Sequence, residues 1–415
     1  MIKELERTIN NSLEKVIKLN GELTFDIDYK QYKNKVFPFN GLIDINRSNV
    51  IIDGSNSIIK INIYNLDSND YALFYIHAEA SNVEIRNLNI KVRITNDRHI
   101  NGRFMFIFNT ARHFRLINSN IGLVSERQAN LFAVYNYGNS FTNTGSIADD
   151  MLVDNNIINV YCETKEHPYP CSCYGLYNDS ANSATVTNNH IYSTLNGYCD
   201  KQQAVGVYTS GYYGRFIGNN IKASALHPTG LELEQASSYG FINAGQISII
   251  TSNNIIAQWA GKAIGIENRG EEALINSNKV LSTHNIFGRC IRNYNSRVII
   301  DSNMLLTTSK NARIVEHIGC NSIINNNIMR VSISTEEAQS GCGIYAANDY
   351  NRSNTIMGNI IINAKTCGLF VNHDIGLVKD NHLGSKDNIQ LTVLNINERV
   401  KDLLDEKHIQ TIYRD

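Results

Sequence analysis

Acidic side chains and arginines recur near the middle of the chain, each placed just after a glycine and an aliphatic residue or their equivalents. Glu232, Glu267 and Arg292 occupy this position in three successive segments. Glu234 and Arg269 lie two residues further along two of those segments. Residues two apart in a β-strand face the same side. We therefore predict that these five side chains form one outward patch and are the catalytic candidates.

When the repeated segments are aligned on the glycine, the position after the aliphatic residue and the position two residues further on each form a column of side chains. Neighbouring strands would stack the members of a column about 4.8 Å apart. We predict that substrate binds along the columns, at Tyr135, Tyr177, Tyr208, Asp179, Tyr294 and His317, with His227 overhanging from a turn. The first column contains Tyr135, Tyr177, Tyr208, Glu232, Glu267, Arg292, Val315, Tyr345 and Phe370, and the second contains Asp179, Ser210, Glu234, Arg269, Tyr294 and His317.

Such a patch suits an oligosaccharide. Carboxylates serve acid and base chemistry, arginine holds a uronate or sulfate group, and tyrosine offers a platform for sugar rings. Glu232 and Glu267 on adjacent strands fit the roughly 5–5.5 Å of a retaining pair, or one of them fits the roughly 6.5–9.5 Å of an inverting pair with Glu234. The sequence leaves both open, and outward charges also form ordinary solvated ion pairs.

A repeat indicates the elements that carry these residues. One or two asparagines followed by an aliphatic residue recur at intervals of 22 to 36 residues, from Asn89-Ile90 to Asn381-His382-Leu383. The segments between them carry β-branched runs such as Arg297-Val298-Ile299-Ile300, which favour strands over helices. Asparagine tolerates the left-handed backbone of a corner, and stacked coils let each amide bind the next.

The repeat predicts a single all-β solenoid, a right-handed parallel β-helix. Both ends of a solenoid need caps. Ile2, Leu5, Ile9, Leu13, Val16 and Ile17 have near-helical spacing, so we expect a cap helix within residues 1–20. The β-helix would span residues 21–390, and residues 391–415 would form a C-terminal cap and tail that includes a short helix.

The run Asn49-Val50-Ile51-Ile52-Asp53-Gly54-Ser55, which follows an amphipathic helix, resembles the opening of the pectate-lyase-like β-helix superfamily. The resemblance covers nearly the whole chain as an architecture. It implies no single activity, because the superfamily includes polysaccharide lyases, glycoside hydrolases, uronan epimerases, phage tailspikes and non-catalytic surface proteins.

Glu232-Leu233-Glu234 is similar to the calcium-binding Glu-X-Glu of the chondroitinase B and alginate lyase family. That resemblance implies a Ca²⁺ ion that neutralises a uronate, with a lysine and an arginine as base and acid. Ser238 and Tyr239 stand where the family has its lysine, and Arg269 or Arg292 reaches the acid position only by a shifted alignment. We therefore expect no cofactor, with Ca²⁺ at Glu232 and Glu234 as the alternative.

Composition limits the partners. Lys+Arg (38) nearly balance Asp+Glu (39), which gives no reason to expect nucleic acid. No segment is apolar enough for a membrane span or a secretion signal, which suits a cytoplasmic, a phage-associated or a signal-processed protein. The leading hypothesis is a carbohydrate-active enzyme, a glycoside hydrolase or transferase or a polysaccharide lyase. The alternative is a non-catalytic glycan-binding or tailspike-like protein, as a homotrimer.

Overall fold

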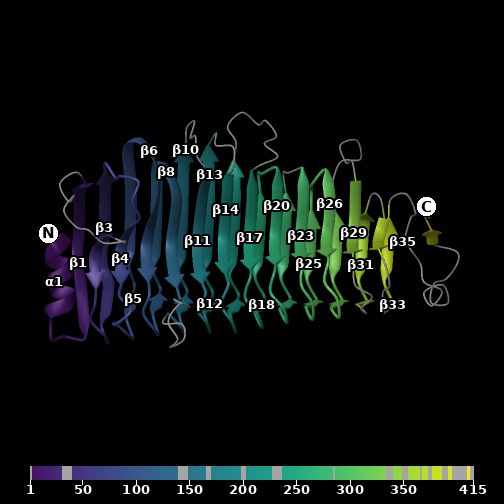
Figure 1. Cartoon of the computed structure of the whole chain (residues 1–415), viewed down its shortest axis with the longest axis horizontal. Coiled ribbons are helices and arrows are strands. Elements are labelled where there is room, and N and C mark those ends of the chain that lie inside the picture. Colours follow the sequence, from purple (N-terminus) through teal and green to yellow (C-terminus); the bar gives the residue numbers. More distant parts are fainter. Residues whose placement is uncertain are drawn as a thin grey trace.

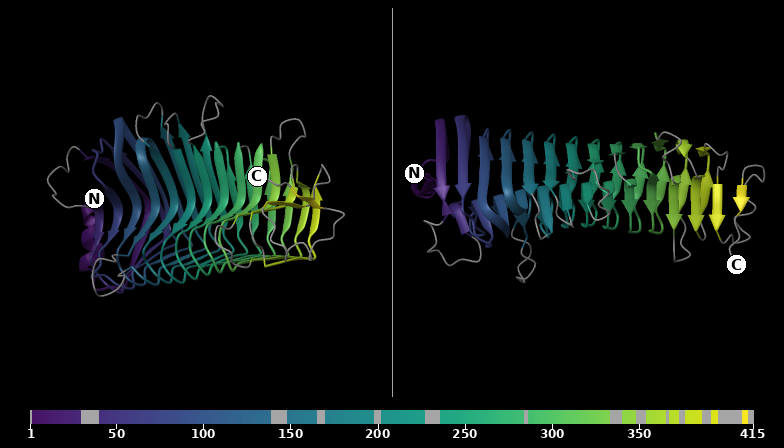
Figure 2. Two further views of the ribbon diagram at one scale, coloured as in Figure 1. Left: turned by 45° about the vertical axis from the view of Figure 1, so that its right-hand side comes forward. Right: turned by 90° about the horizontal axis from the view of Figure 1, so that it is seen from above.

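The protein is a right-handed parallel β-helix preceded by one α-helix, shown as a computed structural model in Figures 1 and 2. The structure describes residues 2–29, 40–138, 148–164, 170–197, 202–226, 236–283, 286–332, 340–347, 354–364, 367–372, 376–385, 391–394 and 409–411. In this part of the chain every pairing between named strands is parallel. The predicted fold class is confirmed.

Each coil contains three strand segments separated by turns. In one coil these are β11 (Cys171–Asp179), β12 (Thr185–Thr187) and β13 (His190–Gly197). The next coil starts with β14 (Gln202–Thr209), which pairs with β11. Repetition of this pattern stacks the strands into three rows that follow the long axis of the solenoid, which is horizontal in Figure 1.

We call the first row the bent row, because its strands change direction near their middle (Figure 2). It contains β2 (Asn40–Ile45), β4 (Tyr71–Ile76), β11, β14, β17 (Ser237–Asn243), β20 (Lys262–Asn268), β23 (Phe287–Asn293), β26 (Asn311–His317), β29 (Ser340–Ala347), β32 (Cys367–Asn372), β35 (Leu391–Leu394) and β36 (Ile409–Thr411).

The second row consists of three-residue strands. Its members are β5 (Glu84–Arg86), β7 (Arg115–Ile117), β9 (Leu152–Asp154), β12, β15 (Arg215–Ile217), β18 (Ile249–Thr251), β21 (Leu274–Asn276), β24 (Ile299–Asp301), β27 (Ile323–Asn325), β30 (Thr355–Met357) and β33 (Leu377–Lys379).

The third row closes each coil. It contains β1 (Val16–Asp28), β10 (Ile157–Thr164), β13, β16 (Asn220–Leu226), β19 (Asn254–Gln258), β22 (Lys279–Thr283), β25 (Met304–Thr307), β28 (Ile328–Val331), β31 (Ile360–Ala364) and β34 (His382–Ser385). Four long strands run through more than one row: β1, whose first residues pair in the second row, β3 (Ile51–Tyr64), β6 (Asn89–Asn109) and β8 (Asn120–Tyr137).

The repeated asparagines form a buried ladder between the second and third rows. Asn278 is typical, because its Nδ2 donates to Asn303 Oδ1 at 3.0 Å and its Oδ1 accepts from the backbone N–H of Asn253. The ladder runs through Asn156, Asn189, Asn219, Asn253, Asn278, Asn303, Asn327, Asn359 and Asn381. These bonds satisfy backbone groups that the corner would otherwise leave buried and unpaired.

The left-handed corner belongs to the residue before each ladder asparagine. Asn155, Asn188 and Ser277 have φ values of 54°, 56° and 55°, and each precedes a ladder member. The repeat in the sequence predicts both roles for one asparagine, and the structure divides them between two neighbours. In pairs such as Asn219-Asn220, the first asparagine belongs to the ladder.

The N-terminal helix is shorter than predicted. Helix α1 covers Ile2–Asn11 and buries Ile2 and Ile9. Leu13 is fully exposed, while Val16 and Ile17 open β1 and pair with Ile51 and Ile52. The apolar spacing after Asn11 is therefore the two-residue period of a strand, and the boundary expected at residue 20 was too late.

At the other end, parallel pairing continues past the boundary expected at residue 390. Strand β35 pairs with β32, and β36 pairs with β35. The short C-terminal helix, expected from Asn397 to Lys407, lies outside the described residues. No helix of the described segments is both long enough and apolar enough to cross a bilayer.

One continuous apolar core fills the interior of the solenoid from Ile2 to Val371. Cys162, Cys171, Cys173, Cys290, Cys320 and Cys342 are buried. Burial raises the pKa of the Cys173 and Cys290 thiols, which keeps them protonated and unreactive.

Candidate functional site

The bend in each strand of the first row creates an outward corner. In β20, Ile266 belongs to the core, and a Cβ added to Gly265 would lie 2.1 Å from Val280 Cγ1, so both residues face inward. The pairing of β20 with β23 skips Gly265. Two consecutive inward positions leave Ile264 before the bend and Glu267 after it facing outward together.

We call this outward corner, followed from coil to coil, the bent face. Two rows of side chains flank the bend along its length. The row before the bend contains Ala72, Met105, Phe132, Tyr174, Val205, Tyr239, Ile264, Arg289 and Arg313. The row after it contains Tyr75, Phe108, Tyr135, Tyr177, Tyr208, Ile242, Glu267, Arg292, Glu316, Tyr345 and Phe370.

The N-terminal half of the bent face is aromatic and apolar. Tyr177 stacks on Tyr208 with ring centroids 4.4 Å apart, and Phe132 stacks on Tyr174 at 4.8 Å. These rings and their apolar neighbours form clusters separate from the main core. Burial raises the pKa of Tyr174 and of Tyr177, so both hydroxyls stay protonated. This half therefore offers rings and neutral hydroxyls.

The C-terminal half carries a cluster of charges around Glu267. The side chain of Glu267 is only 2% exposed. Its Oε1 accepts a hydrogen bond of 2.7 Å from Arg269 Nε, and its Oε2 lies 4.0 Å from Arg292 Nη1. Oε2 is buried and has no hydrogen-bond partner. A buried carboxylate oxygen without a partner lowers the stability of the folded chain, which makes Glu267 Oε2 a candidate functional atom.

Glu316, two coils further along, is surrounded by guanidiniums. Its Oε2 lies 2.8 Å from Arg289 Nε and 3.0 Å from Arg292 Nε, and its Oε1 accepts from Arg313 Nη1 at 2.6 Å. Arg292 therefore joins the two carboxylates into one cluster. We name the six residues Glu267, Arg269, Arg289, Arg292, Arg313 and Glu316 the charged cluster.

The electrostatics of the cluster favour the ionised forms of Glu316 and Arg269, whereas burial lowers the pKa of Arg289. Burial opposes the charge of Glu316, yet the attraction of Arg289, Arg292 and Arg313 holds its pKa below the ordinary value. Burial likewise opposes the charge of Arg269, and its hydrogen bond to Glu267 holds the pKa of this guanidinium above its ordinary value. Four guanidiniums against two carboxylates leave the cluster with an excess of positive charge.

The guanidiniums lie above the carboxylates. Side-chain exposure is 48% for Arg269 and 37% for Arg313, against 2% for Glu267 and 6% for Glu316. Arg292 lies 4.5 Å above the ring of Tyr294, and Arg313 lies 3.8 Å above the ring of Tyr345. An approaching ligand meets cations and aromatic rings before it meets a carboxylate.

Several predicted site residues lie in the rows where the columns placed them, and their roles stay predictions. Tyr135, Tyr177, Tyr208, Glu267 and Arg292 lie in the row after the bend, as the first column required. The second column also places Asp179, Arg269 and Tyr294 correctly, at the carboxyl ends of their strands. Asp179 accepts from Ser180 and Ser210 and lies far from the charged cluster along the solenoid, on β11.

Two members of the first column were placed wrongly. Tyr208 pairs with Ile242, so Ile242 and not Glu232 occupies that coil's position. Arg292 pairs with Glu316, and Val315 lies in the core. A slip of one residue turns every side chain of a strand to the other face. Glu232 and Glu234 lie outside the described residues, as does His227, and their predicted roles stay untested.

A usable signal for the correct register was present in the sequence. A buried polar residue follows the position after the bend, as in Glu267-Asn268 and Arg292-Asn293. Glu316-His317 and Ile242-Asn243 obey this rule, whereas Glu232 is followed by Leu233. Counting back from the buried residue would have found Glu316.

His317 was predicted to bind substrate, and the structure contradicts this. It is completely buried and ends a second ladder of amides inside the bent row. Asn243 donates to Asn268, Asn268 donates to Asn293, and Asn293 Nδ2 donates to His317 Nδ1 at 2.8 Å. A side chain on the inward face cannot reach a ligand on the outward face.

Among the described residues no three His, Cys, Asp or Glu side chains gather closely enough to hold a metal ion. The calcium alternative rested on Glu232 and Glu234, which are outside those residues. The charged cluster itself does not fit a cation, since its carboxylates are already neutralised by arginines.

Comparisons with known proteins find similarity in structure alone. No family model matches the chain, and no curated protein matches its sequence. Among solved structures, the alginate lyase AlyF-OU02 in complex with G6 is 12% identical, with 99% of this chain and 85% of that one covered and a TM-score of 0.45.

The Dettilon tailspike protein is 14% identical over 81% of this chain, with a TM-score of 0.40, and this chain spans 62% of its length. A periplasmic alginate epimerase is 11% identical over 94% of this chain and 81% of that one, with a TM-score of 0.27. The likeness is one of fold. The specific family is not identified.

Proposed function

We propose that this protein cleaves an acidic polysaccharide on the bent face, at the charged cluster, by β-elimination next to a uronate carboxylate. The observation that carries the proposal is the arrangement of the partly exposed guanidiniums of Arg269 and Arg313, with the more deeply placed Arg292 between them, above two buried carboxylates. Guanidiniums bind carboxylates in a planar, two-pronged geometry. The adjoining aromatic half of the bent face supplies platforms for the sugar rings on either side of the reacting unit.

Elimination fits this cluster better than hydrolysis by a carboxylate pair. Hydrolysis needs one carboxylic acid that stays protonated, with a raised pKa. The arginines instead hold the pKa of Glu316 below its ordinary value. Elimination needs neutralisation of the uronate carboxylate, a base for the proton on the adjacent carbon, and an acid for the leaving oxygen.

Glu267 supplies the base in this proposal. Its Oε2 has no hydrogen-bond partner and is covered by Arg292, 4.0 Å away. When Arg292 turns to bind the uronate carboxylate, Oε2 becomes available to take the proton from the carbon next to that carboxylate. The substrate's own charge thereby uncovers the base.

Tyr294 supplies the acid. It is exposed beside Arg292, and burial of its ring raises the pKa of the hydroxyl, which keeps it protonated. As the carbon–carbon double bond forms, the glycosidic carbon–oxygen bond breaks and the leaving oxygen takes the Tyr294 proton. One product carries an unsaturated uronate and the other a free hydroxyl. The proton on Glu267 returns to the Tyr294 phenolate through solvent, so no water or cofactor is consumed.

A second function, binding of an acidic glycan without cleavage, is favoured by one observation. Both described carboxylates of the cluster are engaged by arginines and nearly inaccessible to solvent. Such an arrangement also serves a protein that only holds an anionic chain. The alternative predicted from the sequence, a tailspike-like binding protein, corresponds to this case.

The test is incubation of the purified full chain with polymannuronate, polyguluronate, polygalacturonate and chondroitin sulfate, with and without EDTA. Ultraviolet absorbance of unsaturated uronates and the number of reducing ends are followed together. We expect both to rise on at least one polymer. Glu267→Gln should lower the rate by at least a hundredfold, because the amide cannot accept the proton. Loss of activity in EDTA would instead support the calcium hypothesis at Glu232 and Glu234.

The matched control is Glu271→Gln, an exposed glutamate that pairs with Arg297 away from the bent face. It should leave the rate unchanged. Reducing ends without new absorbance would mean hydrolysis and would contradict elimination. Binding without either signal would mean that the second function is correct.

A further inference from the structure

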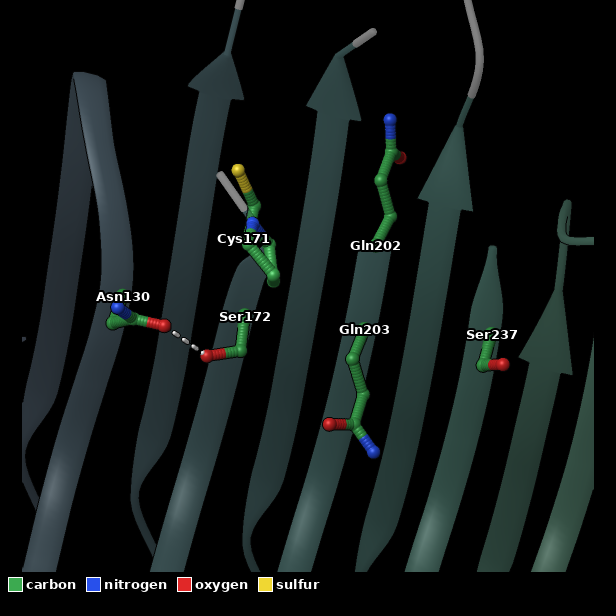
Figure 3. A pocket seen from close by; sticks show the side chains of 7 residues that line it. Asn130, Cys171, Ser172, Gln202, Gln203 and Ser237 are labelled. Atoms are coloured by element: carbon green, nitrogen blue, oxygen red, sulfur yellow. Dashed lines mark hydrogen bonds between the residues drawn. The ribbon is translucent and has the colours of Figure 1, made fainter. Parts of the chain in front are cut away.

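A cavity of about 640 Å³ opens on the bent face beside the aromatic half (Figure 3). The stretch of the bent row that lines it precedes the coils of the charged cluster. Its lining consists of Asn130, Pro170, Cys171, Ser172, Gln202, Gln203 and Ser237. Among the described residues no charged side chain lines it, whereas the charged cluster, which begins on the coil after Ser237, is dominated by arginines.

Strand register turns these residues into a regular polar track. Asn130 pairs with Ser172, Ser172 pairs with Gln203, and Gln203 pairs with Ser237 on four successive coils. Adjacent coils are about 4.8 Å apart, so the track presents an amide or a hydroxyl at each step along the solenoid axis. Figure 3 shows these side chains side by side on their strands.

Part of the hydrogen-bonding capacity of this track is committed and part is unused. Ser172 Oγ donates to Asn130 Oδ1 at 2.6 Å, and Gln203 Oε1 accepts from Tyr174 at 3.1 Å, which fixes both side chains. Gln202 is 1% exposed, its Nε2 donates to the carbonyl of Gly197, and its Oε1 is buried without a partner. A buried acceptor without a partner, in the wall of a cavity, indicates that a donor from a ligand is expected there.

We propose that this cavity is a binding site for neutral sugar units. Amides and hydroxyls match sugar hydroxyls as donors and acceptors, and the described residues of the lining carry no charge that could neutralise a uronate. On the next coil, Ser237 pairs with Lys262, where the positively charged part of the face begins. A chain lying along the axis would place neutral units in the cavity and an acidic unit at the cluster.

This inference deepens the proposed function, because it assigns the substrate to polymers in which neutral and acidic sugars alternate or adjoin. A pure polyuronate would place charge against the neutral track. The cavity nevertheless stands on its own contacts, so its ligand can be tested without any cleavage.

The test is saturation-transfer NMR and calorimetry on the full chain with maltotriose, cellotriose, mannotriose and trigalacturonate as probes. We expect at least one neutral trisaccharide to bind. Gln203→Glu, which keeps the shape and the acceptor for Tyr174 but removes the amide donors and adds a charge, should weaken that binding at least tenfold. Gln258→Glu, the same change on β19 outside the cavity, is the matched control and should have no effect.

Arg292→Gln separates this inference from the proposed function. It should abolish trigalacturonate binding and leave the neutral trisaccharide bound. Failure of trigalacturonate to bind at all, with neutral binding still sensitive to Gln203→Glu, would overturn only the proposed function. The inference is overturned if no neutral probe binds, or if Gln203→Glu binds the neutral probe as well as the unaltered chain does.

Discussion

At the scale of single residues, the structure distinguishes side chains that adjoin in sequence but face opposite sides of a strand. Glu316 lies in the outward charged cluster, while His317 ends a ladder of buried amides. The ladder position is otherwise occupied by Asn243, Asn268 and Asn293 in the preceding coils. His317 can accept the bond from Asn293 only through a neutral ring nitrogen.

His317 therefore predicts a pH dependence of stability. Burial lowers the pKa of His317 to about 4 in the folded chain, from an ordinary value of 6.5. The unfolded chain binds the proton more readily, so stability is full above pH 6.5 and falls as the pH drops towards 4. The loss is on the order of 3 kcal/mol.

The measurement is the melting temperature of the unaltered chain and of His317→Asn between pH 4 and pH 8. The asparagine should continue the ladder, so the two should melt together at pH 8 and the variant should melt higher at pH 4.5. Subtracting the two melting temperatures at each pH removes the contributions of the carboxylates, which both proteins share. If the difference between the two melting temperatures does not change between pH 4 and pH 8, the burial of a neutral His317 is contradicted.

At the scale of the elements, the bend in the first row decides which side chains meet. In strands such as β17 and β20, an inward glycine at the bend lets the next coil approach closely. A Cβ on Gly265 would lie 2.7 Å from the carbonyl oxygen of Cys290, and one on Gly240 would lie 2.7 Å from the carbonyl oxygen of Gly265. Without the bend, strict alternation would turn Ile264 and Glu267 to opposite faces of the strand.

Gly265→Ala should consequently destabilise the chain by about 1–3 kcal/mol, because the added methyl has no space inside the coil. Gly122→Ala is the matched control, since its Cβ would meet nothing closer than 3.7 Å. That change should stay within about ±0.5 kcal/mol. Thermal unfolding of both variants tests this, and equal melting temperatures would contradict the tight packing at the bend.

At the scale of the whole molecule, net charge is a poor guide to what the bent face binds. The chain has a formal net charge of −1, yet its charged cluster gathers four arginines against two glutamates on neighbouring coils. The solenoid produces this local excess because it stacks residues about 25 positions apart in sequence directly onto one another.

Binding of an acidic glycan should accordingly depend on salt, although the whole protein is nearly neutral. We expect the affinity for trigalacturonate to fall by about tenfold between 50 and 500 mM NaCl, because salt screens the partly exposed guanidiniums. The neutral trisaccharide in the cavity is the internal control and should bind almost equally at both concentrations. Calorimetry provides both values, and salt-independent trigalacturonate binding would contradict a role for the arginines.

The sequence by itself determined the repeat, and the repeat determined the architecture. The asparagine motif indicated the coil length and the parallel stacking. A residue that can hydrogen-bond from coil to coil is needed at the same corner of each coil, so its recurrence marks each coil. It also brought Glu267, Arg269, Arg292 and Tyr294 together correctly, since their two coils are adjacent and each has a buried asparagine after the bend.

Only the tertiary structure decided the register of the irregular coils and the burial of the carboxylates. Glu232 and Val315 were assigned to the outward column from local spacing, whereas hydrogen bonds to the neighbouring coils put Ile242 and Glu316 there. Val315 and Glu316 are one residue apart, and both fit the local pattern. The choice between them nevertheless exchanges the core face for the outward face. That choice is made by packing against neighbours, which the sequence of one coil does not contain.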